Sequence, residues 1–473
     1  MEYRSTRGLA PAVNSTEALL TGIAPDGGLY VPAGKLEPLA PGATFRATME
    51  ALLARFFDDI PENVRTDAVS QALARFRSAE ITPLTSFGGT SFLELFHGPT
   101  YAFKDVALTL LPHLMHYAAK QAGIRNVCVL TATSGDTGSA AMQGFANIPG
   151  TRVLVFYPQT GTSEIQRRQM VCCPGENVAA CAIEGNFDDA QAAVKAAFAN
   201  TDLAAQARSA GCLLSSANSI NIGRLFPQVC YYLDCARKLA CPFDVVVPTG
   251  NFGNLLAAWY ARQLGAPIER LTAASNQNRV VCDFVRTGLY DARRPFHVTN
   301  TPSMDILVSS NVERLLWALT EGNAIEVRTW EAQLKAEGSF RISPPAFHRL
   351  KTHFTAGWAT PEETESAILD IWERHAYLAD PHTAIGWKVL HELPATGRPT
   401  VIAATASPWK FPITMLRALT GKSLSDEFAA AEALSAYTGR PPALTDLKTA
   451  PCRFTDVTAR ETVPETIRRT FGF

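Results

Sequence analysis

A single lysine near residue 100 is the first candidate for chemistry in this chain. Lys104 precedes a run in which apolar residues recur at helical spacing, namely Ala107, Leu110, Leu111, Leu114, Met115 and Ala118. Lysine is unfavourable at the start of a helix, because the partial positive charge there favours anions. A buried lysine has a lowered pKa and can attack a carbonyl as an amine. Lys104 is therefore a candidate nucleophile, although a solvated surface lysine is the commoner alternative.

A polar loop after the apolar run 127–131 could bind an anion. The loop contains Thr133, Ser134, Gly135, Asp136 and Thr137 and leads into an Ala-rich helical pattern. Small residues let the backbone approach a ligand closely, and free N–H groups at a helix start suit a carboxylate or a phosphate. An ordinary helix cap explains the same composition, so both interpretations stay open.

A glycine-containing loop after the apolar run 244–248 is typical of a phosphate-binding turn. It contains Thr249, Gly250, Asn251, Phe252, Gly253 and Asn254. The loop matches neither the GxGxxG pattern of dinucleotide folds nor the nucleotide-binding P-loop. The phosphate monoester of a small cofactor fits it better, and a simple connector remains the alternative.

Two further segments place polar groups close together along the chain. Asn218, Ser219 and Arg224 combine an amide, a hydroxyl and a guanidinium, which favours an oxyanion ligand. Helix capping followed by a solvated arginine explains them equally well. Thr405 ends another apolar run and is followed by Lys410, a residue whose type alone says little.

Apolar runs that alternate with helical patterns predict the elements behind these loops. The runs cover residues 127–131, 153–157, 177–183, 244–248 and 401–405. Near-continuous apolar strands between helices indicate an α/β protein whose parallel sheets are covered on both faces. We expect an N-terminal subdomain at 1–88, a two-lobed region at 89–425 with a helical insertion around 283–380, and a C-terminal tail at 426–473.

Composition excludes several classes of function. The chain has 473 residues and a formal net charge of −1, so no basic surface for nucleic acid is indicated. No apolar run approaches the roughly 18 residues of a membrane span. The opening residues lack the apolar core of a secretory signal, and the 10 cysteines show no zinc-binding spacing. We expect a cytoplasmic protein without a bound metal.

Taken together, these segments resemble the longer bacterial and fungal threonine synthases, within the fold type II pyridoxal phosphate (PLP) enzymes. The resemblance covers most of the chain. Its motifs are Ser5-Thr6-Arg7-Gly8, Asp26-Gly27-Gly28-Leu29-Tyr30-Val31-Pro32, Glu94-Leu95-Phe96-His97-Gly98-Pro99-Thr100, Phe103-Lys104-Asp105, Thr133-Ser134-Gly135-Asp136-Thr137-Gly138, Asn218-Ser219-Ile220-Asn221, Pro248-Thr249-Gly250-Asn251-Phe252-Gly253, Ser303-Met304-Asp305-Ile306, Asp380-Pro381-His382-Thr383-Ala384 and Lys410-Phe411-Pro412.

The resemblance implies a two-lobed fold like that of the tryptophan synthase β chain, and a role for each matching segment. Lys104 would carry PLP as a Schiff base and move protons. Loop 249–254 would bind the cofactor phosphate, and Thr405 the pyridine nitrogen. The loop from Thr133 to Thr137 would bind the substrate carboxylate. The substrate phosphate would be bound by Asn218, Ser219 and Arg224, together with Lys410.

The implied reaction converts O-phospho-L-homoserine and water into L-threonine and phosphate, by γ-elimination and then addition of water at Cβ. In the family, the released phosphate has been proposed to assist the addition of water. The resemblance implies a phosphorylated amino acid as the substrate, and we expect a monomer or a homodimer.

Five residues depart from the family pattern near the expected site. Tyr101 and Asn254 stand where the family often has leucine and aspartate. Ser407 and Trp409 stand where the family usually has histidine and alanine, and Arg279 stands where it usually has aspartate. If Trp409 or Arg279 reaches the pocket, its shape and charge change. Two other hypotheses therefore remain. One is a related phospho-lyase or replacement enzyme acting on another phosphoamino acid, and the other is a PLP-binding protein with little catalysis.

Overall fold

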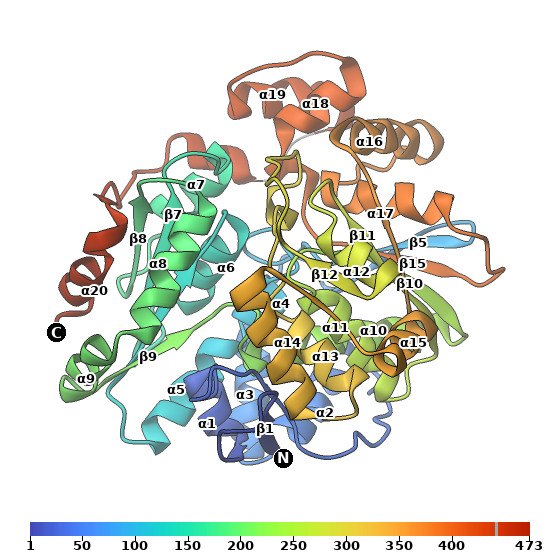
Figure 1. The fold of residues 1–473 in the computed structure, drawn as a ribbon. Coiled ribbons are helices and arrows are strands. Elements are labelled where there is room, and N and C mark those ends of the chain that lie inside the picture. Colours follow the sequence, from blue (N-terminus) through green and yellow to red (C-terminus); the bar gives the residue numbers. More distant parts are fainter. Residues whose placement is uncertain (440–442) are drawn as a thin grey trace.

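Two lobes, each built on a β-sheet, stand beside one another above an N-terminal subdomain in the computed structural model of this protein (Figure 1). The structure describes residues 1–439 and 443–473. All five predicted apolar runs form strands, and the strands between helices are parallel, as the sequence predicts. No described helix is long and apolar enough to cross a membrane.

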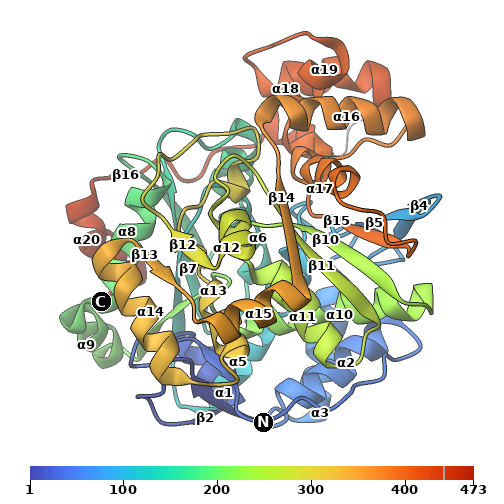
Figure 2. The ribbon, with the colours of Figure 1, turned by 45° about the vertical axis from the view of Figure 1, so that its right-hand side comes forward.

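The larger lobe contains a six-stranded sheet in the order β14-β11-β10-β15-β5-β4 (Figure 2). Only β4 runs antiparallel to its neighbour. Its strands are β4 (Leu84–Phe87), β5 (Thr90–Glu94), β10 (Phe243–Pro248), β11 (Ile268–Ser275), β14 (Phe354–Trp358) and β15 (Thr400–Ala404). Strand β4 thus joins the large sheet from within the expected N-terminal subdomain, and β14 joins it from the insertion expected to be mainly helical.

The smaller lobe contains a five-stranded parallel sheet in the order β16-β8-β7-β6-β9. Its strands are β6 (Asn126–Ala132), β7 (Thr151–Pro158), β8 (Val178–Ile183), β9 (Cys212–Ser216) and β16 (Val457–Thr458). The helices of this lobe are α4 (Asp105–Leu108), α5 (Leu111–Gln121), α6 (Asp136–Phe145), α7 (Glu164–Val171), α8 (Phe187–Ala199), α9 (Thr201–Ser209) and α20 (Val463–Phe471). Buried β-strands of this kind need cover on both faces, which these helices supply.

Helices also cover the large sheet, and short elements form the N-terminal subdomain. The large-lobe elements are α10 (Ile222–Leu239), α11 (Gly253–Gln263), α12 (Val280–Thr287), β12 (Leu289–Asp291), α13 (Val312–Leu319), α14 (Ala324–Glu337), β13 (Ser339–Arg341), α15 (Pro344–His353), α16 (Pro361–His375), α17 (Pro381–Glu392), α18 (Pro412–Thr420) and α19 (Glu427–Thr438). The subdomain consists of β1 (Glu2–Ser5), β2 (Val13–Asn14), α1 (Ser15–Thr21), β3 (Tyr30–Pro32), α2 (Phe45–Phe56) and α3 (Glu62–Leu73). Four short 3₁₀ turns are η1 (Pro302–Met304), η2 (Pro408–Lys410), η3 (Ala443–Lys448) and η4 (Arg460–Thr462).

The helix predicted after Lys104 is divided into α4 and α5. Lys104 directly precedes α4, as its position in the sequence predicts, and the helix breaks at residues 109–110 before α5 begins. Pro112 explains the break, because proline has no N–H and its ring clashes with the carbonyl four residues earlier in a continuous helix. The short α4 keeps Lys104 at a helix start that faces the space between the lobes.

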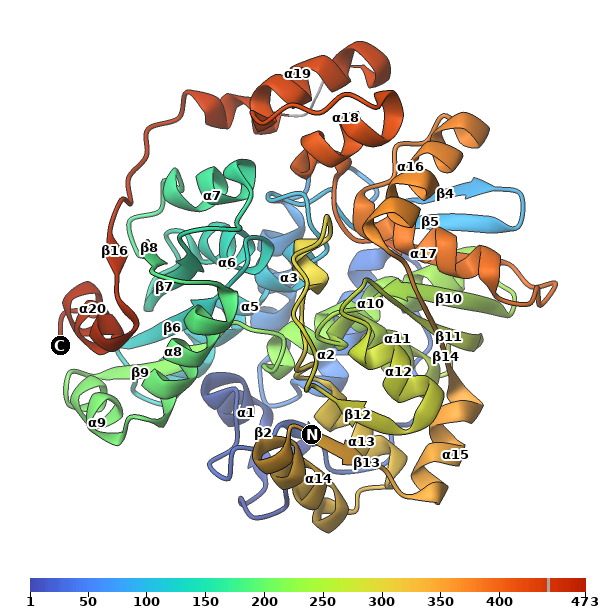
Figure 3. The ribbon, with the colours of Figure 1, turned by 45° about the horizontal axis from the view of Figure 1, so that its top comes forward.

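The C-terminal segment crosses from the large lobe to the small one (Figure 3). After α19, η3 packs against α7, β16 adds the edge strand beside β8, and α20 packs on α8 and β7. Arg168 of α7 donates hydrogen bonds to the carbonyls of Leu447 and Ala450 at 2.5 and 2.9 Å. The segment is therefore an integral part of the small lobe.

Candidate active site

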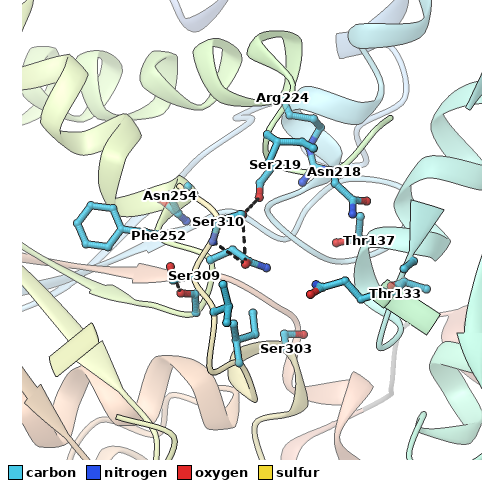
Figure 4. A pocket seen from close by; sticks show the side chains of 18 of the residues that line it. Thr133, Thr137, Asn218, Ser219, Arg224, Phe252, Asn254, Ser303, Ser309 and Ser310 are labelled. Carbon is cyan, nitrogen blue, oxygen red and sulfur yellow. Dashed lines mark hydrogen bonds between the residues drawn. The ribbon is translucent and has the colours of Figure 1, made fainter. Parts of the chain in front are cut away.

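A cavity of about 320 Å³ lies at the carboxyl ends of strands from both sheets (Figure 4). This is the edge at which open parallel sheets bind ligands. Almost all of the sequence-predicted site residues line it: Lys104, Thr133, Ser134, Asp136, Thr137, Asn218, Ser219, Arg224, Thr249, Gly250, Asn251, Phe252, Gly253, Asn254 and Thr405. Gly135 and Lys410 are the two predicted residues that do not line it.

Hydrogen bonds to the end of β15 fix the backbone around Lys104. Phe103 N donates to the carbonyl of Thr405 at 2.9 Å, and Ser407 N donates to the carbonyl of Tyr101 at 3.0 Å. Asp105 accepts hydrogen bonds from Thr100 N and from the Thr100 hydroxyl at 2.8 and 2.6 Å. The lysine and the hydroxyl of Thr405 therefore enter the cavity from two segments that are bonded to each other.

The side chain of Asp136 organises the start of α6. One carboxylate oxygen lies 3.2 Å from Lys104 Nζ and accepts a hydrogen bond from Ser303 at 3.0 Å. The other lies 2.6 Å from Lys410 Nζ and accepts from Gln166 Nε2 at 2.8 Å. Lys410 is fully buried, and its amine also donates to the carbonyl of Thr100 at 3.0 Å. The geometry therefore favours a role for Lys410 through Asp136 rather than direct contact with a ligand in the cavity.

Charges within this cluster shift two pKa values in a direction useful for catalysis. Burial lowers the pKa of Lys104 below its ordinary value, and the charges of Lys410 and Arg224 lower it further, against the opposing effect of Asp136. Burial alone would raise the pKa of Asp136, but Lys410 and Lys104 outweigh burial and hold it well below its usual range. Asp136 thus stays ionised while the amine of Lys104 is easier to deprotonate.

Gly135 has a structural reason to be glycine. Its φ of +148° is strained for other residues, and a Cβ atom there would lie 2.6 Å from the side chain of Gln166. The Thr133 hydroxyl accepts hydrogen bonds from Gly135 N and Gly138 N at 2.9 and 3.0 Å. The hydroxyl of Thr133 therefore holds the shape of the loop. The hydroxyls of Ser134 and Thr137, which also line the cavity, do not take part in these two hydrogen bonds.

Loop 249–254 turns tightly so that α11 begins at the cavity. Phe252 has a φ of +61°, a left-handed conformation that is uncommon for a residue with a side chain. Gly253 begins α11, so the first N–H groups of that helix have no acceptor within the helix. The side chain of Asn254 is fixed by hydrogen bonds from Tyr231 and Tyr232 at 2.9 and 2.6 Å. These features favour a bound anion at this loop.

The start of α10 presents buried polar atoms without partners. Arg224 donates one hydrogen bond, to the carbonyl of Ala217 at 2.5 Å, while its Nε has no partner in the described part of the chain. The same holds for Oδ1 of Asn218. Burial lowers the pKa of Arg224 to about 10. Because an unpaired buried polar group is costly, this cluster favours a ligand that pairs with it.

Three of the residues that depart from the family pattern, Arg279, Trp409 and Ser407, lie outside the cavity. Arg279 Cζ lies 4.4 Å from the centre of the Trp358 ring, and its Nε lies 3.5 Å from Asp283. Trp409 packs against a hydrophobic cluster that includes Tyr101 and Phe428. Ser407 is buried and is not one of the residues that line the cavity. These three departures therefore leave the lining of the cavity unchanged, whereas Asn254, which stands in place of the family's aspartate, is part of that lining.

Some cavity residues received no role from the sequence. His382, Ser303 and Arg7 line the cavity, and each lies in a motif that carries the resemblance. The sequence signal for His382 is the run Asp-Pro-His, in which the aspartate caps a helix and the histidine follows two residues later. No three His, Cys, Asp or Glu side chains among the described residues gather closely enough to hold a metal ion.

Comparison with protein families identifies the chain. The model described as pyridoxal-phosphate dependent enzyme matches residues 90–405. The models for the threonine synthase N terminus and C-terminal region match residues 2–73 and 383–467. Threonine synthase from Pseudomonas aeruginosa is 38% identical over 435 residues, which cover 89% of this chain and 91% of the relative. This chain belongs to the threonine synthase family.

Two further relatives place the chain within that family. Threonine synthase-like 1 from Macaca fascicularis is 37% identical over 90% of this chain, and the match spans 61% of the length of that protein. The crystal structure of PLP-bound threonine synthase from Brucella melitensis is 37% identical, with a TM-score of 0.88 over 99% of both chains. The fold type II architecture expected from the resemblance is thus confirmed.

Proposed function

We propose that this protein is a PLP-dependent threonine synthase, which converts O-phospho-L-homoserine and water into L-threonine and phosphate. One observation carries the proposal. In a chain of the threonine synthase family, the buried amine of Lys104 and the unpaired polar atoms of Asn218 and Arg224 line the same cavity. An amine that can bind a carbonyl and a site that favours an oxyanion are the two groups that this reaction requires.

The residues around Lys104 fit PLP. The cavity volume of about 320 Å³ lies at the lower end of the range for small-molecule sites. Lys104 would hold the cofactor aldehyde, the N–H groups of loop 249–254 its phosphate, and the hydroxyl of Thr405 its ring nitrogen. When bound, PLP withdraws electrons from the substrate and makes its Cα and Cβ protons acidic. A hydroxyl partner leaves the ring nitrogen unprotonated, which tempers that withdrawal.

Lys104 and Asp136 divide the proton chemistry between them. Lys104 moves protons at the substrate carbons, because its pKa is lowered and its amine lies in the cavity. Asp136 stays ionised and orients the amine, with Lys410 as its second counter-ion. Lys410 therefore contributes through Asp136.

The remaining predicted residues bind the two anionic ends of the substrate. Ser134 and Thr137, at the start of α6, bind the carboxylate by hydroxyl and backbone N–H groups. Asn218, Ser219 and Arg224 bind the phosphate that leaves. The unpaired Nε of Arg224 supports this assignment, because a guanidinium binds phosphate through two parallel hydrogen bonds.

The test is product analysis with purified protein, PLP and O-phospho-L-homoserine. We expect equal amounts of phosphate and L-threonine from the wild type. Lys104→Ala removes the amine, so we expect at least about a 1,000-fold loss of turnover and loss of the absorbance of the lysine-bound cofactor. A Lys104→Ala protein that retains this absorbance and makes threonine would refute the proposal.

A related phospho-lyase is the second candidate function. Relatives named threonine synthase-like 1 match this chain as closely as those named threonine synthase. Such an enzyme would release phosphate and give 2-oxobutyrate and ammonia instead of threonine, so the same product analysis separates the two. We also propose that the protein acts in the cytoplasm. We propose that it is a monomer or a homodimer, and sedimentation of the purified protein would test this oligomeric state.

A further inference from the structure

His382 is oriented by a carboxylate and presents a free nitrogen at the cavity. It lies in the first turn of α17, where Asp380 caps the helix and accepts a hydrogen bond from His382 N at 3.0 Å. Nδ1 of the ring lies 2.8 Å from Asp380 Oδ1. The residue is only 2% exposed, and Nε2 has no partner in the described part of the chain. This is the arrangement of a base positioned by a carboxylate.

The surroundings of His382 fix the ring in this orientation. Phe411 contacts it edge to face, with ring centroids 4.9 Å apart. Three carboxylates interact electrostatically with the ring. They are Asp380 on the same turn, Asp136 at the start of α6 and Asp305 after η1. With a carboxylate at Nδ1, the neutral ring carries its proton there and leaves the lone pair of Nε2 available.

The carboxylates on the cavity wall and Lys104 are already engaged. Asp136 is paired with two lysines, and Lys104 is assigned to proton transfer at the substrate carbons. Glu313 and Glu331 are bound by Arg7, at 3.0 and 3.3 Å. Among the described residues that line the cavity, His382 is the only histidine. It is therefore the group best suited to accept a proton from a neutral nucleophile.

We propose that His382 is the base that deprotonates the water added in the second half of the reaction. The water oxygen forms the bond to Cβ, and its proton passes to Nε2 of His382. The electron pair of the Cα–Cβ double bond moves to Cα, which takes a proton from Lys104. The proton on His382 then returns to solvent. This inference rests on the proposed function.

The chemistry favours the role of base over that of acid. The second pKa of a phosphate monoester is about 6, so its monoanion is accessible near neutral pH, and C–O cleavage of that monoanion releases hydrogen phosphate without a proton from the protein. Water is a weak nucleophile, and a positioned base typically contributes about 10²–10⁴-fold to such a step. His382 therefore matters most after phosphate has left.

The variant His382→Asn tests the proposal, because the asparagine amide can still donate to Asp380 while Nε2 is lost. In a single turnover with O-phospho-L-homoserine, we expect phosphate release within about threefold of the wild type. We expect threonine formation to fall about 100-fold or more, with 2-oxobutyrate in its place. His382→Ala should regain threonine formation when imidazole is added. A wild type that releases no phosphate would refute the proposed function itself.

His391→Asn is the matched control, because His391 lies on the same helix and its Nδ1 is 2.8 Å from the carbonyl of Trp387, away from the cavity. This control should make threonine at the wild-type rate. Threonine formation by His382→Asn at the control rate would overturn the proposal and leave the released phosphate as the base. Equal loss of phosphate release and threonine formation would overturn it too, since His382 would then act earlier.

A second readout needs neither cofactor nor turnover. In cofactor-free protein labelled with ¹⁵N-histidine, the ring signals lost in His382→Asn belong to His382. We expect the neutral form of the ring to carry its proton on Nδ1 and none on Nε2. A proton on Nε2 in the neutral ring would overturn the proposal, because that tautomer has no lone pair facing the water.

Discussion

Two helix starts on the cavity wall, those of α6 and α10, differ in how far their polar groups are satisfied. At α6 the carboxylate of Asp136 has four side-chain partners, and two of them are lysines. At α10, Oδ1 of Asn218 and Nε of Arg224 lack partners in the described structure. The carboxylate of Asp136 is thus paired within the protein, whereas the two polar atoms at α10 are left for a ligand.

This difference separates stability from affinity. Groups that pair with each other contribute to folding, and removal of one partner leaves the other buried and uncompensated. Buried polar groups that are unpaired in the free protein lower its folding stability, and they form strong hydrogen bonds once a ligand binds. Substitutions in the two regions should therefore have opposite consequences for the free protein.

The largest effect is expected for Asp136→Asn. The change leaves Lys104 and Lys410 facing each other without a counter-charge, so the free energy of unfolding should fall by about 3–5 kcal/mol. Thermal and denaturant unfolding would measure it. Asp234→Asn is the control, because Asp234 also pairs with two cations, Arg237 and Lys238, but these are partly exposed. An Asp136 variant no less stable than this control would contradict the comparison.

Removal of the Arg224 side chain should have the opposite pattern. Arg224→Met deletes a buried charge whose hydrogen bond goes to the carbonyl of Ala217 and not to a carboxylate, so the thermal midpoint should stay unchanged or rise. The KM for O-phospho-L-homoserine should increase roughly 10- to 100-fold, the effect of a lost hydrogen bond to a charged group. Steady-state kinetics and thermal unfolding of the same sample test both parts. If Arg224→Met unfolds as easily as Asp136→Asn, the proposed difference between the starts of α6 and α10 would be contradicted.

The smallest effect is expected in the pH dependence of stability, through Glu331 on the cavity wall. Burial, together with Glu313, raises the pKa of Glu331 from 4.5 to about 7. The folded state therefore binds this proton more tightly than the unfolded state does, so stability falls as pH rises from about 4.5 towards 7. Glu331→Gln removes this contribution, and the difference between thermal midpoints at pH 5 and pH 7.5 should shrink. If Glu331→Gln leaves the difference between the two thermal midpoints unchanged, the prediction that burial raises the pKa of Glu331 is contradicted.

The sequence predicts the parts of this fold that depend on local pattern. The five apolar runs and the place of Lys104 before a helix are confirmed, because alternation of strand and helix is encoded within short windows. Strand β14 lies in a region that we expected to be mainly helical, because a short edge strand has little periodicity.

The site is predicted less completely, because its key contacts join distant parts of the chain. Lys410 and Asp136 meet across 274 positions, and no local pattern indicates that pairing. The resemblance implied Lys410 as a further phosphate ligand, whereas the structure buries it against Asp136. His382 received no role, since its Asp380 partner becomes meaningful only once the cavity is known.

The crossing of the C-terminal segment has a consequence for biosynthesis. Strand β16 covers the free edge of β8, and Ile467 and Phe471 of α20 are buried in the core of the small lobe. These residues are synthesised more than 200 positions after the other strands of the small lobe. Most of the small lobe is encoded between residues 105 and 216, but its folding is completed only after residues 457–471 have been synthesised. Until then its exposed edge strand is open to pairing with other chains.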